Sequence, residues 1–385
     1  MSGSYKATVE LSGLTLTNAT PVYSGAAVHI QNGKRIKVKV VTGTTNTLTD
    51  AVGGSQKGCL YIKGHAEFAQ KGTLNVVGNV KHGIKAGEYF SLKNATITVK
   101  TTGGLHYNNG TTENTNYTGD TDNVDSDYYS SPKGIKAGVK TQSGNSYTYS
   151  GGIVISGGTI IVTTTGHNAE GIESKNTLEI TGGYIYCNTY DDAINSASDL
   201  TISGGYVMAV ASANDGIDAN GNMYIKGGNV FAVAASGAEV ALDANTEDNK
   251  QLYITGGNIV AVGGLESGAS VSGGTAYQTS SYTKGAWYAL YNSSSSVAFA
   301  FKVPSNNSMG TPMVVYTTGT TSLKSGVTGS GTSFWSGNGY TSCSGGSSVT
   351  LSAYNSGGQG GGDQPGGGDG PGGGGSGPGG GGQGH

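Results

Sequence analysis

The chain has 385 residues, of which 12% are charged, and its net charge is −3, so it lacks the basic surface that nucleic-acid binding requires. No stretch approaches the run of about 20 apolar residues that a membrane-spanning helix needs. Three cysteines are too few for a disulfide framework, and Cys187 is expected to be a packed thiol. No signal peptide precedes the first strand pattern, so we expect an incomplete N-terminus.

The first hundred residues contain apolar pairs that lie six positions apart. These pairs are Ile30 with Ile36, Ile62 with Phe68 and Ile84 with Phe90, and an earlier copy opens at Val9. Two insertions, at about residues 101–131 and 139–150, then interrupt the pattern. The first insertion is rich in Tyr, Asn and Asp, and we expect it to form a side loop.

The central part of the chain repeats one pattern five times. Each copy has an alternating apolar pair, then Gly-Gly, then a second alternating segment, and the copies start at Ile153, Leu178, Leu200, Met223 and Leu252. A further apolar position precedes most pairs by six residues, at Ile172, Ile194, Ile217 and, in the longer last copy, Leu242. Three short β-branched strands per turn predict an all-β solenoid, the parallel β-helix. With the N-terminal copies it has about nine rungs and is roughly 40 Å tall, at about 4.8 Å per rung.

The two C-terminal segments differ from the repeat. Residues 276–354 alternate like antiparallel strands, and we expect a small β cap that covers the last rung. Residues 355–385 are rich in Gly and Pro and have little to bury, so we expect a disordered tail. The predicted division is a β-helix at 1–275, a cap at 276–354 and a tail at 355–385.

Residues at one position of the repeat form a column, because successive turns stack. The position after the apolar corner residue gives a first column, which reads Gln31, Lys63, Lys85, Lys136, Glu173, Asn195, Asp218 and Asp243. Two positions before the corner residue, a second column reads His82, Lys133, Glu170, Asp192 and Asp215, with Asp191 and Glu239 beside it. One corner is therefore predicted to be basic in its N-terminal half and acidic in its C-terminal half.

The acidic half of this corner is a candidate metal site. Like charges about 5 Å apart repel by ~1 kcal/mol in water, so stacked carboxylates need a cation, a raised pKa or full exposure. Oxygen ligands of this kind suit Ca²⁺. The candidate ligands are Glu170, Glu173, Asp191, Asp192, Asn195, Asp215, Asp218, Glu239 and Asp243. The alternative is that Asp and Asn stand here only because they tolerate turns.

The basic half is a candidate site for a polyanion. Its members suit an anionic polymer with a short, regular repeat, such as a uronic acid polymer, and they are Lys63, Lys85, Lys136, Lys133 and His82. The alternative is that these are exposed corner lysines that keep the protein soluble.

Aromatic residues recur just after the Gly-Gly pairs. Tyr184 and Tyr206 follow the second glycine directly, and Tyr186 and Phe231 lie three residues after it. If this column faces outward, its rings are platforms on which sugar rings stack. The alternative is that the insertions or the cap bury this face.

The sequence contains no catalytic motif that we recognise. The histidines form no metalloprotease pattern, and there is no nucleophile elbow and no P-loop. A lysine next to carboxylates that hold Ca²⁺ could nevertheless support β-elimination of a uronate, because Ca²⁺ acidifies the uronate and the lysine takes the proton. Lys136 and Glu173 are neighbours in the first column, so this reaction stays open.

At this point the chain resembles a known family. The segment 43–99, with its NTLTD and GTLNVVGN motifs, and the later GIES and DGID turns are similar to bacterial carbohydrate-binding domain-containing β-helix proteins, once classed as a domain of unknown function. The resemblance covers roughly residues 5–275. It implies a secreted, right-handed parallel β-helix that binds calcium and plant-type polysaccharides, chiefly pectate and cellulose. It also implies a pectate-lyase-like fold without established lyase activity.

The acidic corners of that family correspond to three tripeptides here, which are Glu170-Gly171-Ile172, Asp192-Ala193-Ile194 and Asp215-Gly216-Ile217. The chain departs from the family at His82-Gly83-Ile84 and Lys133-Gly134-Ile135, where basic residues stand instead. A calcium site is therefore not expected at these two turns.

These observations together predict an extracellular or cell-surface monomer that binds acidic or cellulose-like polysaccharide with the help of Ca²⁺. Two other functions stay open. One is a calcium-dependent, pectate-lyase-like eliminase. The other is a structural adhesin or surface spacer, whose Gly-rich tail is a flexible tether.

Overall fold

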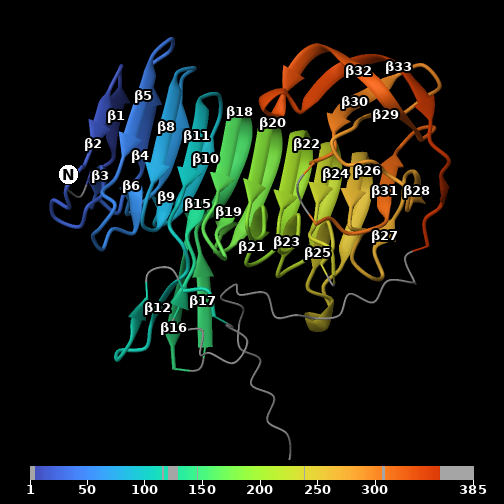
Figure 1. Ribbon diagram of the computed structural model, residues 1–385. Coiled ribbons are helices and arrows are strands. Elements are labelled where there is room, and N and C mark those ends of the chain that lie inside the picture. The colour runs from blue at the N-terminus through green and yellow to red at the C-terminus, as the bar shows by residue number, and fades with distance from the viewer. Residues whose placement is uncertain are drawn as a thin grey trace, which may run out of the picture.

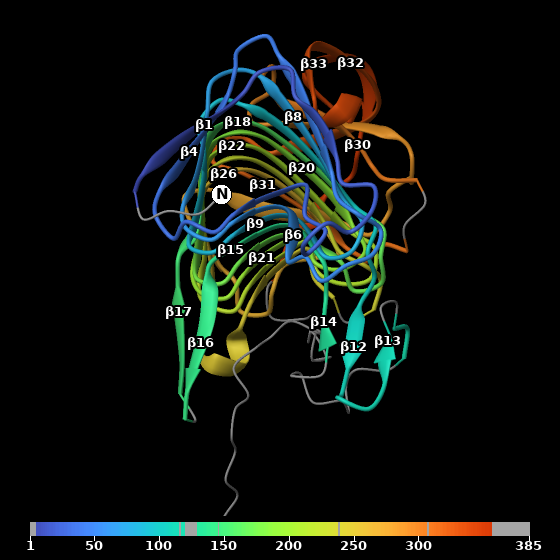
Figure 2. The same ribbon diagram turned by 90° about the vertical axis from the view of Figure 1, so that its left-hand side faces the viewer.

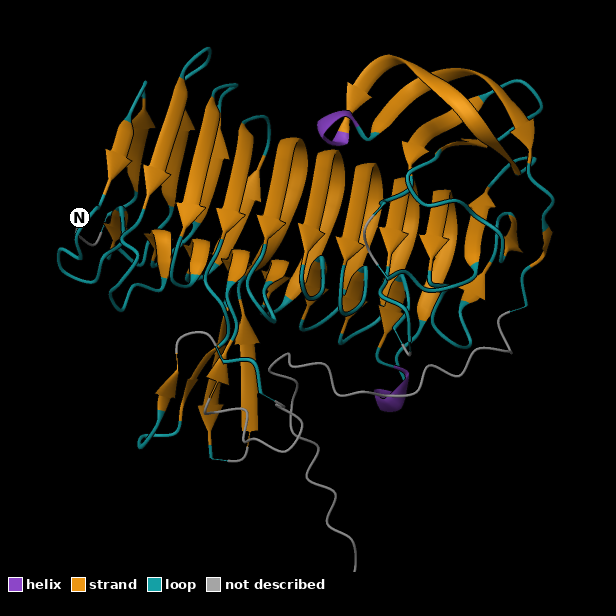
Figure 3. Ribbon diagram, in the orientation of Figure 1, coloured by secondary structure: helices purple, strands orange, loops and turns teal. Residues whose placement is uncertain are grey.

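The computed structural model describes residues 5–114, 117–119, 129–144, 146–237, 239–305 and 308–355. This part of the chain is all-β, as predicted, and contains no α-helix (Figure 3). Its helical turns are two short 3-10 segments, η2 (Thr246–Asp248) and η3 (Trp335–Gly337). None of its helices is long and apolar enough to cross a membrane. The predicted tail lies outside the described residues, apart from Asn355.

The N-terminal strands form two parallel series that stack side by side (Figure 1). The first series contains β1 (Ala7–Leu11), β4 (Ile36–Val40), β7 (Ala66–Ala69) and β10 (Tyr89–Leu92). The second contains β2 (Thr15–Thr17), β5 (Thr45–Thr49), β8 (Thr73–Gly78) and β11 (Thr96–Thr101). Both series end on one long strand, β18 (Gly152–Thr164), which pairs with β10 and with β11.

The Gly-Gly repeats form long bent strands. These continue the parallel ladder from β18 through β20 (Thr177–Thr189), β22 (Leu200–Ala211), β24 (Met223–Val233) and β26 (Leu252–Val262). Each contains two of the predicted short strands, so the prediction of three separate strands per turn is wrong here. Gly205 explains the bend, because its φ is +87° and a Cβ would lie 2.9 Å from the carbonyl carbon of Gly182.

A second parallel sheet contains the predicted corner. Among the described residues it has eight short strands, which are β3 (Val28–Ile30), β6 (Gly58–Ile62), β9 (His82–Ala86), β15 (Lys133–Ala137), β19 (Glu170–Ser174), β21 (Ile194–Ser196), β23 (Ile217–Ala219) and β25 (Leu242–Ala244). Its inward side chains, such as Ile172, Ile194 and Ile217, join one continuous core with those of the long strands. Cys187 is fully buried in this core, as predicted.

The sheets become mixed at the C-terminal end. Strand β27 (Ser270–Val271) still pairs in parallel with β26, but β31 (Met313–Thr317) pairs antiparallel with β26 and with β28 (Thr275–Thr279), and β28 also pairs with β34 (Ser352–Ala353). A closed barrel follows, formed by β29 (Trp287–Tyr291), β30 (Val297–Lys302), β32 (Ser322–Phe334) and β33 (Gly339–Ser348). It packs on the outer face of the last long strands (Figure 1).

Both insertions contain antiparallel strands. The first has β12 (His106–Asn108), β13 (Glu113–Asn114) and β14 (Tyr129–Ser130), so it is a small sheet where a side loop was expected. The second is a hairpin of β16 (Val139–Ser143) and β17 (Ser146–Ser150). Figure 2 shows both extending from the side of the short strands, away from the barrel.

Candidate functional site

The short strands align most of the predicted corner. The first column is confirmed from Lys85 to Asp243, because Lys85, Lys136, Glu173, Asn195, Asp218 and Asp243 are successive register partners. The column is wrong before Lys85, where the partner is Tyr61, followed by His29. Lys63 and Gln31 therefore do not belong to it. A slip of two residues keeps every side chain on the same face, so alternation alone does not reveal it.

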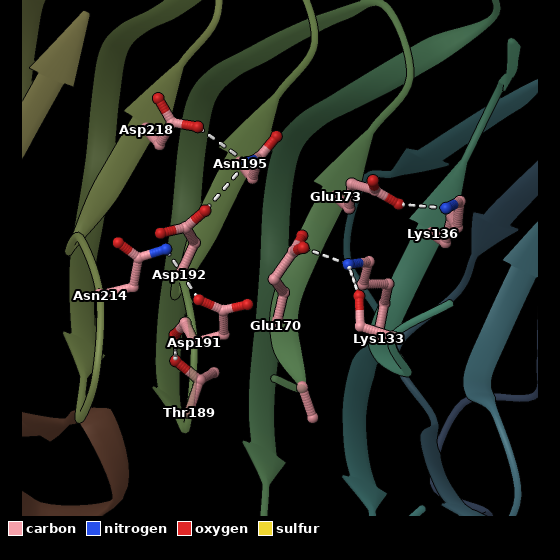
Figure 4. Close-up of polar contacts among 12 residues, drawn as sticks. Lys133, Lys136, Glu170, Glu173, Thr189, Asp191, Asp192, Asn195, Asn214 and Asp218 are labelled. Atoms are coloured by element: carbon pink, nitrogen blue, oxygen red, sulfur yellow. Dashed lines mark hydrogen bonds and ion pairs between the residues drawn. The ribbon is translucent and has the colours of Figure 1, made fainter. Parts of the chain in front are cut away.

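Lysines and glutamates pair where the basic and acidic halves meet (Figure 4). Lys133 forms an ion pair with Glu170. The carboxylate of Glu173 lies 2.6 Å from Lys136 Nζ and 2.5 Å from Lys175 Nζ. Glu170 and Glu173 are only 1% and 2% exposed. Two lysines thus compensate the charge of Glu173, whereas burial raises the pKa of Glu170 to about 8 despite the charge of Lys133. The role of both residues as calcium ligands stays a prediction.

The ion pairs outweigh burial in setting the pKa of Glu173 and of Lys133. Burial alone would raise the pKa of Glu173, but Lys136 and Lys175 hold it well below its usual range. Burial alone would lower the pKa of Lys133, but the neighbouring Glu170 raises it. Lys175, which the sequence analysis missed, directly follows strand β19 and so lies beside the column.

A pocket of about 220 Å³ adjoins the basic half of the corner. We call it the lysine pocket, and its lining residues are Lys57, Lys81, His82, Lys85, Tyr129, Ser130, Ser131, Lys133 and Lys136. Among the described residues, none of its lining side chains is acidic. The first insertion supplies Tyr129, Ser130 and Ser131, which the sequence analysis missed. The correct strand register would have found Lys57, because it precedes Gly58, the partner of His82.

The lysine pocket is recessed, so the alternative of exposed corner lysines does not hold for its buried members. Lys85 is 8% exposed and Lys133 is 3% exposed, and His82 is buried as well. Lys85 Nζ donates a hydrogen bond to the carbonyl oxygen of Gly138 at 2.7 Å, and Lys81 Nζ donates to Ser130 Oγ at 2.9 Å. A side chain of the first insertion and the backbone just before the second therefore hold two of the pocket lysines.

Two groups in the lysine pocket have strongly lowered pKa values. Burial, with the charge of Lys136, lowers the pKa of Lys85 to about 7. Burial, with the charges of Lys136 and Lys81, holds the pKa of His82 well below its usual range. His82 Nδ1 also accepts a hydrogen bond from the backbone N–H of Lys133 at 3.0 Å, as a neutral imidazole does. The charge of the pocket is therefore sensitive to pH near neutrality.

The acidic half is held by amide hydrogen bonds (Figure 4). Asn195 Nδ2 donates to Asp192 Oδ2 at 3.0 Å and to Asp218 Oδ2 at 2.8 Å. Asn214 Nδ2 donates to Asp191 Oδ1 at 2.8 Å. The backbone N–H of Asp215 donates to Asp192 Oδ1 at 3.2 Å. Asn195 thus acts as a bridge between two aspartates, a role that the sequence analysis did not assign to it.

Apart from Glu170 and Glu173, the carboxylates of this half lack a cationic partner in the described part of the chain. Burial and neighbouring carboxylates raise the pKa of Asp192 and of Asp215 well above the usual range. They also raise the pKa of Asp218 to about 7 and that of Asp243 to about 11. Within the described residues, no group of three or more His, Cys, Asp or Glu side chains is placed to hold a metal ion.

The aromatic column lies partly beneath the barrel. Phe231 is fully buried and contacts Phe301, with 4.7 Å between ring centroids, so its predicted role as a sugar platform is wrong. Tyr206 lies 4.5 Å from Phe334 of the barrel and 5.2 Å from Tyr184. Tyr184 and Tyr186 are half-buried at the margin of the barrel.

Comparison with known proteins identifies the family to which the chain belongs. A family model described as "Carbohydrate-binding domain-containing protein" matches residues 2–212 and, in an overlapping match, residues 163–325. The chain belongs to this family. No curated protein matches it. It is also similar to a solved structure described as the polysaccharide lyase-like protein from C. thermocellum, a gadolinium derivative, with 24% identity over 58% of this chain and 76% of that chain and a TM-score of 0.41.

Proposed function

We propose that this protein binds acidic polysaccharide and that the lysine pocket holds an acidic group of the polymer. The observation that carries the proposal is the lining, which among the described residues has five lysines and one histidine but no carboxylate. At about 220 Å³ the pocket is smaller than the roughly 300–1,000 Å³ typical of small-molecule sites. It therefore suits one charged sugar unit, such as a uronate, within a longer chain.

The fold supports this proposal by offering a long surface. We propose that the parallel sheets wind as a right-handed parallel β-helix of about nine rungs over residues 1–275, and that residues 276–354 cap it. The two stacked parallel series and the sheet of short strands support this interpretation. Acidic polysaccharides occur outside cells, so we propose an extracellular or cell-surface location, with which a carbohydrate-binding family is compatible.

Binding of hexagalacturonate by calorimetry tests the lysine pocket. Lys57→Gln/Lys81→Gln removes two lining charges without touching the buried ion pairs, and we expect affinity to fall about tenfold or more, which is 1.4 kcal/mol. The matched control is Lys71→Gln/Lys100→Gln, which makes the same charge change at exposed positions elsewhere. Equal losses in both double variants would show attraction by overall charge, and no loss in either would refute the pocket.

Calcium at the acidic half is a separate part of the proposal. The kind of donor is suitable, because Asp192, Asp215, Asp218 and Asp243 supply carboxylate oxygens, which Ca²⁺ prefers. Their raised pKa values mean that a bound cation would displace protons from these carboxyl groups. Asp191 and Glu239 lie beside them. Asn195 would give up its hydrogen bonds to Asp192 and Asp218 when these carboxylates bind the ion. Ca²⁺ bound only by the folded protein raises the Tm. We expect this rise in the wild type and its loss in Asp215→Asn/Asp218→Asn. A wild-type Tm that does not change with Ca²⁺ would exclude the site.

Cleavage of the same polymer is a second candidate function. It is favoured by Lys85, whose pKa of about 7 leaves part of its amine neutral and basic at physiological pH. β-Elimination would transfer the C5 proton of a uronate to the amine and expel the O4 leaving group, which creates a C4–C5 double bond. Absorbance at 235 nm during incubation with polygalacturonate detects this product, and a flat trace leaves binding alone.

A further inference from the structure

A cleft of about 360 Å³ lies between the long strands and the barrel. Strands β18 and β20 supply one wall, with Thr159, Ile160, Ile161, Tyr184 and Tyr186. The end of β32 and the turn η3 supply the other, with Thr332, Ser333, Phe334, Trp335, Ser336 and Gly337. We call this the aromatic cleft. Nothing in the first and second corner columns contributes to it.

The wall of the aromatic cleft is built from stacked rings. Tyr184 stacks on Tyr206 at 5.2 Å and on Phe334 at 5.8 Å between ring centroids. Phe334 packs edge-on against Trp335 at 4.7 Å. Trp335 is itself fixed, because its Nε1 donates a hydrogen bond to the carbonyl oxygen of Tyr206 at 3.1 Å. The rings are thus positioned before any ligand arrives.

The lip of the cleft has an unusual backbone. Trp335 and Ser336 both have φ of +53°, and Gly337 has φ of +87°. Non-glycine residues rarely adopt this left-handed conformation, and it persists where the surrounding structure holds it. Here the buried Trp335 anchors the turn, so that the exposed hydroxyl groups of Ser336, Ser333 and Thr332 stand at the rim.

The composition of the cleft defines the chemistry of its ligand. Its described lining contains aromatic rings, hydroxyl groups and aliphatic side chains, but no ionisable acid or base other than tyrosine. Aromatic faces pack against the C–H faces of a sugar ring, and hydroxyl groups fix its orientation. We propose that the aromatic cleft binds an uncharged pyranose unit of a polysaccharide. This rests on the proposed carbohydrate binding but not on the lysine pocket.

The aromatic cleft and the lysine pocket are on different sides of the molecule. Figure 1 shows the barrel above the long strands, whereas the insertions that line the lysine pocket hang below the short strands. The two sites therefore accept different sugars independently, one neutral and one acidic. This separation lets one experiment test them apart.

The test uses the fluorescence of Trp335 in the full chain. The protein has two tryptophans, and Trp287→Phe leaves Trp335 as the reporter. We expect cellohexaose, an uncharged probe, to change its emission on saturation. Tyr184→Ala should weaken this binding about tenfold or more, because it removes a stacking face. Thr332→Tyr fills the cleft from the exposed rim and should block binding while leaving the stacked rings in place.

A matched control is available on another face. Tyr224 stacks on Tyr253 at 5.2 Å, outside the cleft, so Tyr224→Ala should bind cellohexaose as the wild type does. Unchanged emission at saturating probe, or equal affinity in wild type, Tyr184→Ala and Thr332→Tyr, overturns the inference. If cellohexaose still changes the emission while hexagalacturonate fails to bind, the cleft is supported and the lysine pocket is refuted.

Discussion

Glu173→Gln is the perturbation that tests the charged corner most directly. Glu173 is 2% exposed, and its two carboxylate oxygens face the amines of Lys136 at 2.6 Å and Lys175 at 2.5 Å. Glutamine has nearly the same shape but no charge, so the variant leaves two lysine charges without their shared partner. Removing one member of a buried ion pair typically costs about 3–5 kcal/mol. We expect a loss of unfolding free energy in that range.

Urea denaturation followed by circular dichroism measures this loss. The matched control is Glu10→Gln, because the Glu10–Lys39 pair has a similar separation of 2.7 Å but is exposed to solvent. An exposed pair contributes about 0–1 kcal/mol, so the control should be nearly neutral. The variant Glu173→Gln/Lys136→Met should lose less stability than Glu173→Gln, because one buried lysine charge fewer has lost its carboxylate.

The pH dependence provides an independent check. The pKa of Glu173 in the folded protein lies well below the ordinary value of 4.5, so its ion pairs stabilise the fold fully above about pH 4.5 and less as pH falls through the lowered value. The difference between wild type and Glu173→Gln should therefore be full at pH 7 and shrink in acid. A loss as small as that of Glu10→Gln at pH 7 would refute the buried network.

Three further predictions concern the bend, the barrel and the lysine pocket. Gly205→Ala should lower the unfolding free energy by about 1–3 kcal/mol in urea denaturation, because its φ is +87° and backbone atoms lie 2.9 Å from the new Cβ; an unchanged midpoint contradicts this. Phe231→Ala should lower it by about 3–5 kcal/mol and speed proteolysis between the barrel and the long strands, since the ring is fully buried; cleavage at the wild-type rate would argue against this contact. Hexagalacturonate affinity should fall as pH rises through about 7, where Lys85 loses its proton, and calorimetry should show this step absent in Lys85→Met. A step that survives in Lys85→Met belongs to another group.

The regular half of the fold was predictable because Gly-Gly marks each bend. The columns through Ile185, Val207 and Val230 have the predicted register. Before Lys85 no such marker recurs, and Leu60 rather than Ile62 pairs with Ile84. Both choices put an apolar side chain in the core, so hydrophobic alternation does not distinguish them.

The environment of the candidate residues was less predictable than their alignment. The sequence predicted that Lys133 and Glu170 are neighbours in one column, but it did not predict that they form a buried ion pair. Burial depends on the insertions and on the barrel, which pack on the repeat from distant parts of the chain. The same holds for Phe231. Its side chain was expected to face outward, but the sequence did not reveal that Phe301 of the barrel covers it.

The unbroken register of the long strands means that the distance between the barrel and the lysine pocket can change only in whole strand spacings. Adjacent strands in a sheet are about 4.8 Å apart, and each copy of the repeat adds one such step. Adding or removing a copy between β20 and β26 would therefore move the barrel relative to the lysine pocket by a whole step, while side chains keep their faces. In related proteins with different repeat numbers, the barrel and the lysine pocket would contact a bound polymer at separations that differ by multiples of this spacing.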